Sequence, residues 1–388
     1  MSKFVILMRF VWWIFLLFPI DSLIILFNKI KQDNRKILFV RLDSIGDVIL
    51  SLDLMRAVRE KYPAPEYSID LICKDRCAQL PSTLGYFDKV ISVNKPKLVL
   101  NPLFRFSLFT QLRRAGYSMV IHPVYSRDFC WSDGIVRISG ASKKIGAHGS
   151  LELMSAFQRR LSDSWYTELV ETGPLSVSEI VRNAHYGTRL GLPFRPKVAD
   201  LRVLVRPDRA ARAPYFVLFP GAALAFRRWP PSRFAAVAKD IARRTGWVAV
   251  VCGSKDDRPL GDQIASQAGG TVAVEVICGE TDLRDVIDVF ARAELIVTSD
   301  TMAVHLGAAL GRPTVCISSV AHHDRFIPYD PSVAPVEGGV LPIAVKKDLP
   351  CGGCDWFCIH KVPAGGIMPC IDGVTVPSVM QAVASLIE

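Results

Sequence analysis

The chain has 388 residues, half of them hydrophobic and 22% charged, which excludes a disordered protein and favours two domains over a single core. Lysine and arginine outnumber aspartate and glutamate by 47 to 37, and the net charge is +10. This balance fits nucleic acid, an anionic membrane surface or a phosphorylated substrate. Because no basic stripe interleaved with aromatic residues and no nucleic-acid-binding signature occurs, nucleic acid is not expected as a partner.

The chain begins with an apolar segment at 4–27, which basic residues follow. As a helix it would be about 36 Å long, enough to cross a hydrocarbon core of about 30 Å. Arg9, Pro19 and Asp21 interrupt it, and no small-residue cleavage site follows, so a removed signal peptide is not expected. We expect residues 1–35 to form a membrane-associated helix, spanning or lying in the interface, with the main body on the cytoplasmic side. The alternative is a buried N-terminal helix of a soluble domain.

A predicted strand at 36–42 leads into a tight turn and then into a helix with apolar periodicity at 48–60. The turn lacks the G-x-G-x-x-G spacing of a dinucleotide fingerprint, which argues against a dehydrogenase. Gly46 is expected to let the backbone turn sharply, and Asp47 stands at the start of the helix. A carboxylate there can cap the helix, bind a hydroxyl group or act as a base.

The same alternation continues through the first half of the chain. We expect strands at 68–73, 89–93 and 118–122 and a basic helix at 104–114. Arg105 and the other arginines of that helix face either solvent or an anionic acceptor. In the loops that follow, His122 and Arg127 are further candidates for acceptor contacts. Alternating βα units of this kind imply a doubly wound parallel sheet.

A second βα series follows a linker at 196–213, where proline and arginine are frequent. Its first strand, at 215–219, leads into Gly221 and then into Arg227 and Arg228 before a helix. A glycine turn followed by two arginines can bind a diphosphate, because guanidinium pairs bidentately with phosphate oxygens. The alternative is a structural loop with solvated arginines.

Three further loops of this series follow predicted strands at 247–252, 272–277 and 295–298. Their candidate nucleotide ligands are Asp257, Thr281, Asp300, Thr301 and His305. An acidic residue after the second strand can hold ribose hydroxyls, and a helix N-terminus suits phosphate. Because the carboxyl ends of parallel strands meet at one sheet edge, these loops predict a nucleotide site. Alternatively, Asp300 or Thr301 only caps the helix, and His305 is a core histidine.

Three motifs together resemble glycosyltransferase family 9, the ADP-heptose:lipopolysaccharide heptosyltransferases: KILFVRLDSIGDVILSL, FPGAALAFRRWPPSRFAAVA and SDTMAVHLGAALGRPTV. The resemblance covers roughly residues 36–328. It implies a GT-B fold, two Rossmann-like domains facing a cleft, preceded here by the apolar helix. The implied divisions are a membrane-associated helix at 1–35, an acceptor-binding domain at 36–195, the linker at 196–213, a nucleotide-sugar-binding domain at 214–350 and a tail at 351–388.

The resemblance further implies inverting transfer of a sugar from ADP-heptose or a similar donor to a lipid-linked oligosaccharide. The acceptor would be a lipopolysaccharide core or another envelope glycan, at the cytoplasmic face of the inner membrane. Two alternatives stay open. One is a nucleotide-sugar-binding protein that has lost catalysis, and the other is a family member that uses another nucleotide sugar.

Site residues follow from the matching positions. Asp47 matches the aspartate expected to act as general base, and Gly46 lies beside it towards the acceptor. The donor is expected to contact Gly221, Arg227, Arg228, Asp257, Thr281, Asp300, Thr301 and His305, with Arg227 in the place of the family's usual lysine. The sequence has no D-x-D pair. Arginines and helix N-termini are therefore expected to stabilise the leaving diphosphate, with no cofactor required for catalysis.

The tail is rich in cysteine and is expected to end in a helix at 379–387. Cys351, Cys354, Cys358 and Cys370, with His360 between them, resemble a cluster seen in some family members. In a reducing compartment a thiolate site holding a structural zinc is more plausible than disulfides. Free thiols remain the alternative, since the spacing lacks a second C-x-x-C.

Overall fold

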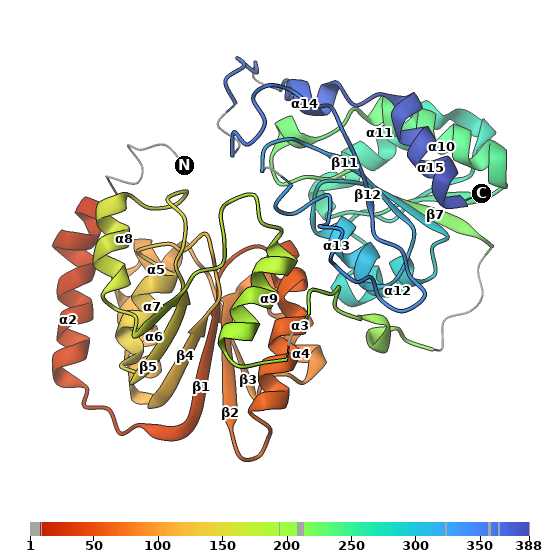
Figure 1. Cartoon of the computed structure of the whole chain (residues 1–388). Coiled ribbons are helices and arrows are strands. Elements are labelled where there is room, and N and C mark those ends of the chain that lie inside the picture. The colour runs from red at the N-terminus through yellow and green to blue at the C-terminus, as the bar shows by residue number, and fades with distance from the viewer. Residues whose placement is uncertain are drawn as a thin grey trace. The chain divides into compact units, whose positions relative to one another are not determined.

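The computed structural model describes residues 8, 10–193, 195–207, 213–322, 324–355, 358–363 and 365–387. The chain forms two compact units (Figure 1): unit 1 consists of Met1–Pro174 and Arg182–Phe194, and unit 2 of Leu175–Val181 and Arg195–Glu388. Each unit contains one six-stranded parallel sheet, so the α/β class with two doubly wound sheets is confirmed. Two predicted features lie partly outside the described residues, namely the N-terminal helix at 1–7 and 9 and the linker at 208–212.

The sheet of unit 1 has the strand order β3-β2-β1-β4-β5-β6. Its strands are β1 (Asp33–Arg41), β2 (Ser68–Lys74), β3 (Lys89–Val93), β4 (Tyr117–His122), β5 (Lys143–Ala147) and β6 (Glu168–Val170). The centre of β1 is fully buried, as is expected of a parallel strand that helices cover on both faces. The order reverses between β1 and β4. At such a switch point the two following connections diverge and leave a crevice at the carboxyl edge of the sheet.

Helices cover both faces of this sheet (Figure 1). They are α3 (Ile45–Lys61), α4 (Gln79–Leu84), α5 (Lys97–Leu100), α6 (Pro102–Arg114), α7 (Ser132–Ser139), α8 (Ala156–Asp163) and α9 (Glu179–Arg189), with a short 3-10 turn η2 (Asp75–Cys77). The apolar N-terminal segment is helical from residue 10, as the π-helical stretch η1 (Trp13–Leu17) and α2 (Phe18–Phe27), and α2 packs against α6. By length and apolar composition, the helix Phe10–Phe27 could cross a membrane. Core helices of soluble proteins can have the same length and composition.

The sheet of unit 2 repeats this topology, with the order β12-β11-β10-β7-β8-β9. Its strands are β7 (Tyr215–Phe219), β8 (Val248–Val251), β9 (Val274–Val276), β10 (Leu295–Ser299), β11 (Thr314–Ser318) and β12 (Ile343–Lys346). All of its pairings are parallel. The switch point lies between β7 and β10, so the loop that contains Gly221 and the loop that contains Asp300 flank one crevice.

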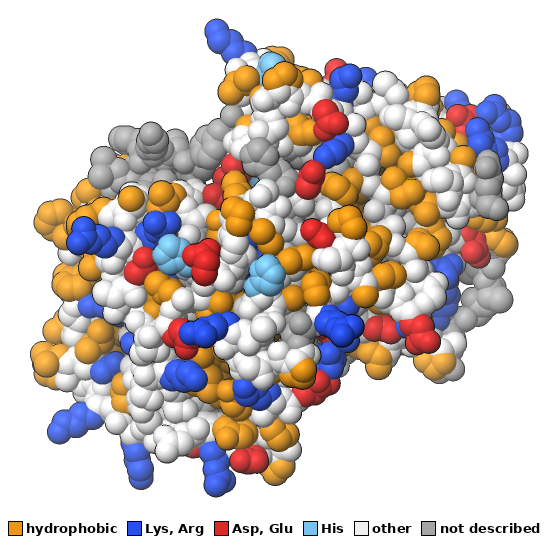
Figure 2. All heavy atoms as spheres, in the orientation of Figure 1, with side chains coloured by type: hydrophobic (Ala, Val, Ile, Leu, Met, Phe, Trp, Pro, Cys, Tyr) orange, Lys and Arg blue, Asp and Glu red, His pale blue; other side chains and the backbone are white. Residues whose placement is uncertain are grey.

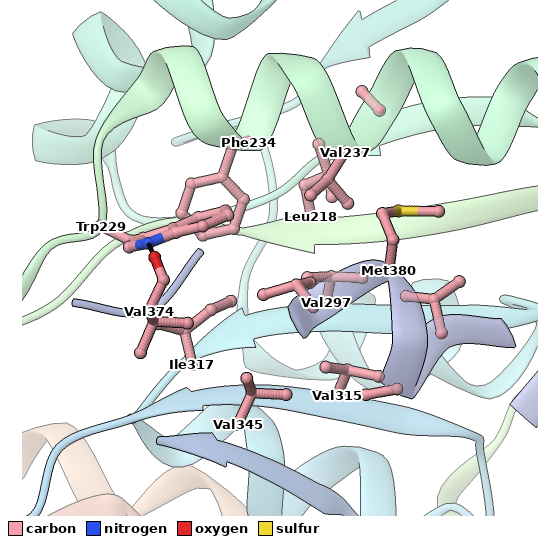
Figure 3. Close-up of a cluster of buried hydrophobic side chains, with 14 of the residues drawn as sticks. Leu218, Trp229, Phe234, Val237, Val297, Val315, Ile317, Val345, Val374 and Met380 are labelled. Atoms are coloured by element: carbon pink, nitrogen blue, oxygen red, sulfur yellow. Dashed lines mark hydrogen bonds between the residues drawn. The ribbon is translucent and has the colours of Figure 1, made fainter. Parts of the chain in front are cut away.

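The helices of unit 2 are α10 (Pro231–Thr245), α11 (Arg258–Ala268), α12 (Leu283–Ala291), α13 (Met302–Ala309), α14 (Pro369–Asp372) and α15 (Val376–Ile387), with 3-10 turns η3 (Arg202–Leu204), η4 (Ala225–Arg227), η5 (Lys255–Asp257) and η6 (Gly269–Thr271). Gly246 ends α10 with a φ of +73°, a conformation that suits glycine. Trp229, Phe234 and Met380 belong to the buried core, and the Trp229 indole donates to the carbonyl of Val374 at 2.9 Å (Figure 3). The last helix therefore packs on the body of this unit, as expected.

Candidate active site

Asp47 lies in the first turn of α3, at the switch point of unit 1. Its Oδ2 accepts a hydrogen bond from the backbone amide of Ser44 at 2.9 Å, so the helix-capping interpretation is realised. A carboxylate has two oxygens and about four acceptor positions, so capping through one oxygen leaves the group able to accept a proton. Gly46 also lies within the first turn of α3. The prediction of a sharp turn at Gly46 is therefore wrong, because Gly46 is part of the helix.

Two cations that the sequence did not single out surround this turn. The buried Arg41, at the end of β1, donates to the Asp47 carbonyl at 3.1 Å and pairs with Asp43 at 3.1 Å. Lys95 follows β3, lies 2.7 Å from an oxygen of Asp128 and donates to the Leu42 carbonyl at 3.3 Å. Arg41 ends β1 and Lys95 follows β3 of the same sheet. This position at the carboxyl ends of strands could have identified them as site candidates from the sequence. Each is paired with a second carboxylate, so two ion pairs lie beside Asp47 at the carboxyl edge of unit 1.

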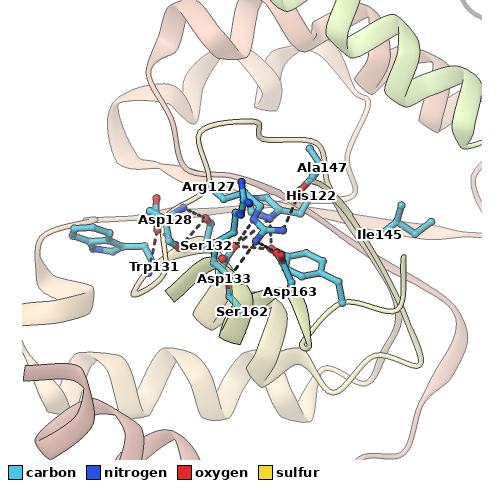
Figure 4. A network of polar contacts seen from close by, with 12 residues as sticks. His122, Arg127, Asp128, Trp131, Ser132, Asp133, Ile145, Ala147, Ser162 and Asp163 are labelled. Carbon is cyan, nitrogen blue, oxygen red and sulfur yellow. Dashed lines mark hydrogen bonds and ion pairs between the residues drawn. The ribbon is translucent and has the colours of Figure 1, made fainter. Parts of the chain in front are cut away.

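His122 and Arg127, predicted to contact the acceptor, are fully buried (Figure 4). His122 Nδ1 lies 2.7 Å from the Tyr166 hydroxyl, which donates to Asp133 at 2.6 Å. Arg127 donates to the Ala147 carbonyl at 3.0 Å. Burial lowers the pKa of His122 well below its ordinary value, and Arg127 lowers it further. Burial raises the pKa of Asp133 to about 6, against the effect of Arg127. This network joins the loops that follow β4 and β5, and neither predicted residue reaches solvent.

In unit 2, Arg227 and Asp300 meet at the switch point. The Arg227 guanidinium donates to the Asp300 carbonyl at 2.7 Å and lies 3.8 Å from its carboxylate. Burial lowers the pKa of Arg227 and raises the pKa of Asp300, and the pair opposes both shifts. His322, after β11, also acts on the Asp300 carboxylate. The loops after β7 and β10 are thus joined by a charged contact between residues that are far apart in the sequence.

Gly221, Arg228 and Asp257 form a second contact at the same edge. Asp257 accepts from the amide and hydroxyl of Ser254 at 2.9 and 2.6 Å. The Arg228 guanidinium lies 3.8 Å from the Asp257 carboxylate and donates to the Ala222 carbonyl at 3.1 Å. A Cβ at Gly221 would lie 2.5 Å from Asp257 Oδ2, so the approach of the two loops requires glycine there. Each arginine of the predicted diphosphate site therefore lies beside a carboxylate.

The remaining predicted donor residues are Thr301, His305 and Thr281, and the first two make contacts within unit 2. The Thr301 hydroxyl accepts from the Ala303 amide at 3.4 Å, so Thr301 rather than Asp300 caps α13. His305 is buried, its Nδ1 lies 2.8 Å from the Tyr329 hydroxyl, and the two rings stack at 5.8 Å. Burial lowers the pKa of His305 to about 3, so its imidazole is neutral at physiological pH. Thr281 lies between β9 and α12 with a buried hydroxyl oxygen.

Two contacts involve the tail cysteines. Cys351 Sγ is 3.7 Å from His360 Nε2, and the Cys358 thiol adds to the effect of burial in raising the pKa of Cys370. None of the ten cysteines, all of which lie among the described residues, forms a disulfide bond. Among the described residues, no group of three or more histidine, cysteine, aspartate or glutamate side chains is already arranged to hold a metal. The donor set of thiols and one imidazole nevertheless suits zinc.

Two Rossmann-like units in one chain, each with its polar residues at the switch point of its sheet, form the GT-B fold. The model of glycosyltransferase family 9 (heptosyltransferase) matches residues 105–340, and the chain belongs to this family. The resemblance that the three motifs indicated is thereby confirmed.

Individual relatives are distant but cover most of the chain. Lipooligosaccharide heptosyltransferase 2 of Haemophilus ducreyi is 22% identical over 338 residues, which are 79% of this chain and 91% of the relative. The structure of Escherichia coli ADP-heptose lipopolysaccharide heptosyltransferase II is 19% identical with a TM-score of 0.62, covering 90% of this chain and 98% of its own. E. coli heptosyltransferase WaaC with ADP-2-deoxy-2-fluoro heptose is 17% identical with a TM-score of 0.65, covering 90% and 99%. At these identities the structures establish the fold.

Proposed function

We propose that this glycosyltransferase moves a heptose, or a similar sugar, from an ADP-sugar to a lipopolysaccharide core or another envelope glycan. The observation that supports this most is the equivalent placement of polar residues at the switch points of the two sheets. One switch point has a carboxylate at a helix N-terminus beside two ion-paired cations, and the other has two guanidinium groups beside carboxylates. The first set suits a hydroxyl that must lose a proton, and the second suits a leaving diphosphate.

In unit 2, Arg227 and Arg228 would hold the diphosphate of the donor. A guanidinium group has several N–H donors in one plane. One donor of Arg227 binds the Asp300 carbonyl, and one donor of Arg228 binds the Ala222 carbonyl. The carboxylates of Asp300 and Asp257 limit the rotation of these side chains, so the remaining donors are orientated before the ligand arrives. The N-terminus of α13 adds amide dipoles that favour an anion. Gly221 and Asp257 would flank the ribose, and Thr281 the adenine.

In unit 1, Asp47 would act as the general base. The acceptor oxygen attacks the anomeric carbon, its proton passes to the Asp47 carboxylate, and the bond to the diphosphate breaks with its electron pair leaving on ADP. A single displacement of this kind inverts the anomeric configuration. The hydrogen bond from the Ser44 amide fixes one oxygen of Asp47, so the carboxylate is held in place. The charge that develops on the diphosphate would be stabilised by Arg227 and Arg228, and we propose that no metal is needed.

Arg41 and Lys95 lie beside the turn of Asp47 as ion pairs with Asp43 and Asp128. Lys95, the more exposed of the two cations, can donate to a phosphate or carboxylate oxygen of a glycan. Relatives of this chain are named as heptosyltransferases of lipopolysaccharide or lipooligosaccharide. We therefore propose a lipid-linked oligosaccharide acceptor at the cytoplasmic face of the inner membrane. His122 and Arg127 would position the loops of this site from the interior, without touching the acceptor.

Thermal unfolding in the presence of ADP-, GDP- and UDP-sugars tests the donor, because a ligand that binds only the folded state raises the unfolding temperature. The expected result is a rise with ADP-sugars and a smaller or no rise with the others. Product analysis with an oligosaccharide acceptor then separates an enzyme from a binding protein. A rise with ADP-heptose but no transfer to any acceptor would favour the inactive alternative.

A further inference from the structure

The N-terminal helix presents a continuous apolar surface on its outer side. Nine of its large apolar side chains are exposed: Met8, Val11, Trp12, Ile14, Phe15, Phe18, Leu23, Leu26 and Phe27. The most exposed is Phe15, at 78%. A soluble helix that packs on a domain has polar residues on its outer face. This helix has the opposite pattern, which marks a surface that contacts something apolar.

Neighbouring helices of unit 1 extend this surface. The Trp12 indole donates to the Val99 carbonyl in α5 at 2.8 Å, and the Phe10 and Phe157 rings meet edge to face at 5.7 Å. We define the apolar face as the nine helix residues together with Leu100, Leu103, Phe106 and Phe157, all exposed. Orange side chains follow the border of unit 1 along which α2 lies (Figure 2). In the described part of unit 2, exposed large apolar side chains are few and far apart in the sequence.

A buried ion pair holds the helix against unit 1. Arg105 of α6 donates to both oxygens of Asp21, at 2.8 and 2.7 Å, and also to the carbonyls of Leu98 and Cys130. The Asp21 and Arg105 side chains are 1% and 0% exposed. Arg105 thus faces neither solvent nor an acceptor, and both of those expectations are wrong. At the other end, Arg113 donates to the Asn28 carbonyl at 2.9 Å.

This attachment is incompatible with a helix that spans the bilayer on its own. Pulling the helix away would leave the Arg105 guanidinium buried without its partner, which is strongly unfavourable. It would also place the Asp21 carboxylate in hydrocarbon, where an unpaired charge is costly. The helix therefore keeps its inner side on unit 1 while its outer side is free to enter an apolar phase.

Charge distinguishes a membrane from a second protein as the occupant of the apolar face. Asp21 is the only carboxylate between residues 10 and 32, and it is buried. Beyond α2, the exposed Lys29, Lys31 and Arg35 accompany one exposed carboxylate, Asp33, and the exposed Lys97 and Arg160 lie on α5 and α8. An apolar band flanked by lysine and arginine complements the acyl region and the anionic headgroups of a lipid bilayer.

We propose that unit 1 is a monotopic membrane domain whose apolar face inserts into one leaflet of an anionic bilayer, with the N-terminal helix lying in the interface and not crossing it. Leu100 and Leu103 on α5 and α6 then enter the same leaflet as the helix. A helix that spans alone would not need them. The interaction does not depend on the donor or the reaction, so it can be tested without turnover.

Co-sedimentation of the full chain with vesicles tests this proposal, using phosphatidylglycerol with phosphatidylethanolamine, and phosphatidylcholine alone. The key variant carries Leu100→Ser and Leu103→Ser, positions that are 73% and 81% exposed. We expect at least about hundredfold weaker binding to the anionic vesicles, because two large apolar side chains no longer leave water. The matched control carries Val203→Ser and Ile359→Ser, equally exposed positions of unit 2, and should bind like the wild type.

Three outcomes separate the possibilities. Loss of binding in the α5/α6 variant, with alkaline carbonate releasing the wild type from vesicles, supports the interfacial arrangement. If the α5/α6 variant binds vesicles like the wild type, and alkaline carbonate does not release the wild-type protein, the helix is a spanning anchor and the proposal is overturned. No vesicle binding, with a dimer in solution that the same variant converts to monomers, identifies a second copy as the occupant and also overturns it. An unchanged unfolding temperature of the variant confirms that its fold is intact.

Discussion

Gly221→Ala is expected to weaken donor binding while leaving the fold in place. Gly221 follows β7 at the switch point of unit 2, and the substitution adds one methyl group to the loop. That methyl carbon would lie 2.5 Å from Oδ2 and 2.6 Å from Cγ of Asp257. Ordinary contacts begin near 3.4 Å. The carboxylate or the loop therefore has to move by almost 1 Å.

The cost of that movement follows from what holds Asp257. Its carboxylate can withdraw only by giving up the hydrogen bonds from the Ser254 amide and hydroxyl. Hydrogen bonds to charged groups contribute about 1.5–3 kcal/mol each, and water replaces part of this when the group moves. We expect a total near 3 kcal/mol, which corresponds to about hundredfold weaker ADP-sugar binding if the whole cost falls on the ligand site. Arg228, which lies beside the same carboxylate, would lose its orientation as well.

Isothermal titration with the ADP-sugar measures the loss of donor affinity, and thermal unfolding of the same preparations measures any loss of stability. Gly270→Ala is the matched control, because a methyl group at that exposed position meets no atom within 4 Å and its φ is ordinary. The control should bind and unfold like the wild type. Wild-type affinity and an unchanged unfolding temperature in Gly221→Ala would show that Asp257 is not held as we describe, and would refute the reasoning.

Two further predictions concern a buried histidine and the tail. Burial lowers the pKa of His305 to about 3, so this side chain stays neutral in the folded state. In the unfolded chain its pKa is the ordinary 6.5, so only the unfolded state binds a proton there as the pH falls below that value. The folded state therefore loses stability as the pH falls. His305→Asn should reduce the loss of unfolding free energy between pH 7 and pH 5 by about 2 kcal/mol, measured by denaturant titration; an unchanged pH dependence would contradict this. Elemental analysis of protein purified under reducing conditions should find one zinc per chain, and Cys354→Ser should lose it; iron in its place, or no metal, would contradict a zinc site.

Long apolar runs made much of the fold predictable. The strand at 215–219 was predicted with the bounds of β7, because a continuous apolar run stands between two prolines. The helix expected after Arg228 is present as α10, which ends at a glycine with left-handed geometry, Gly246. By contrast, β5 and β6 were not predicted as strands. They begin with charged residues, Lys143 and Glu168, and are five and three residues long, so neither has the long apolar run by which other strands were predicted.

The candidate site was predictable where it depends on strand order alone. In a parallel sheet the loops that follow strands share one edge, which is why Arg227 and Asp300 were placed in one site before their contact was known. Long-range partners were not predictable. Arg105 was misassigned because Asp21, which pairs with it, lies 84 residues earlier in the chain. His122 was assigned to the acceptor because its partner Tyr166 lies 44 residues later in the chain.

The central claim is that Asp47 removes the acceptor proton while unit 2 binds the donor. Measuring the transfer rate and ADP-sugar affinity of Asp47→Asn in parallel tests it most directly, because asparagine can keep the hydrogen bond from Ser44 but cannot take a proton. The account predicts a kcat lower by about 10² to 10⁴, with wild-type affinity for the ADP-sugar. A kcat close to that of the wild type would contradict it.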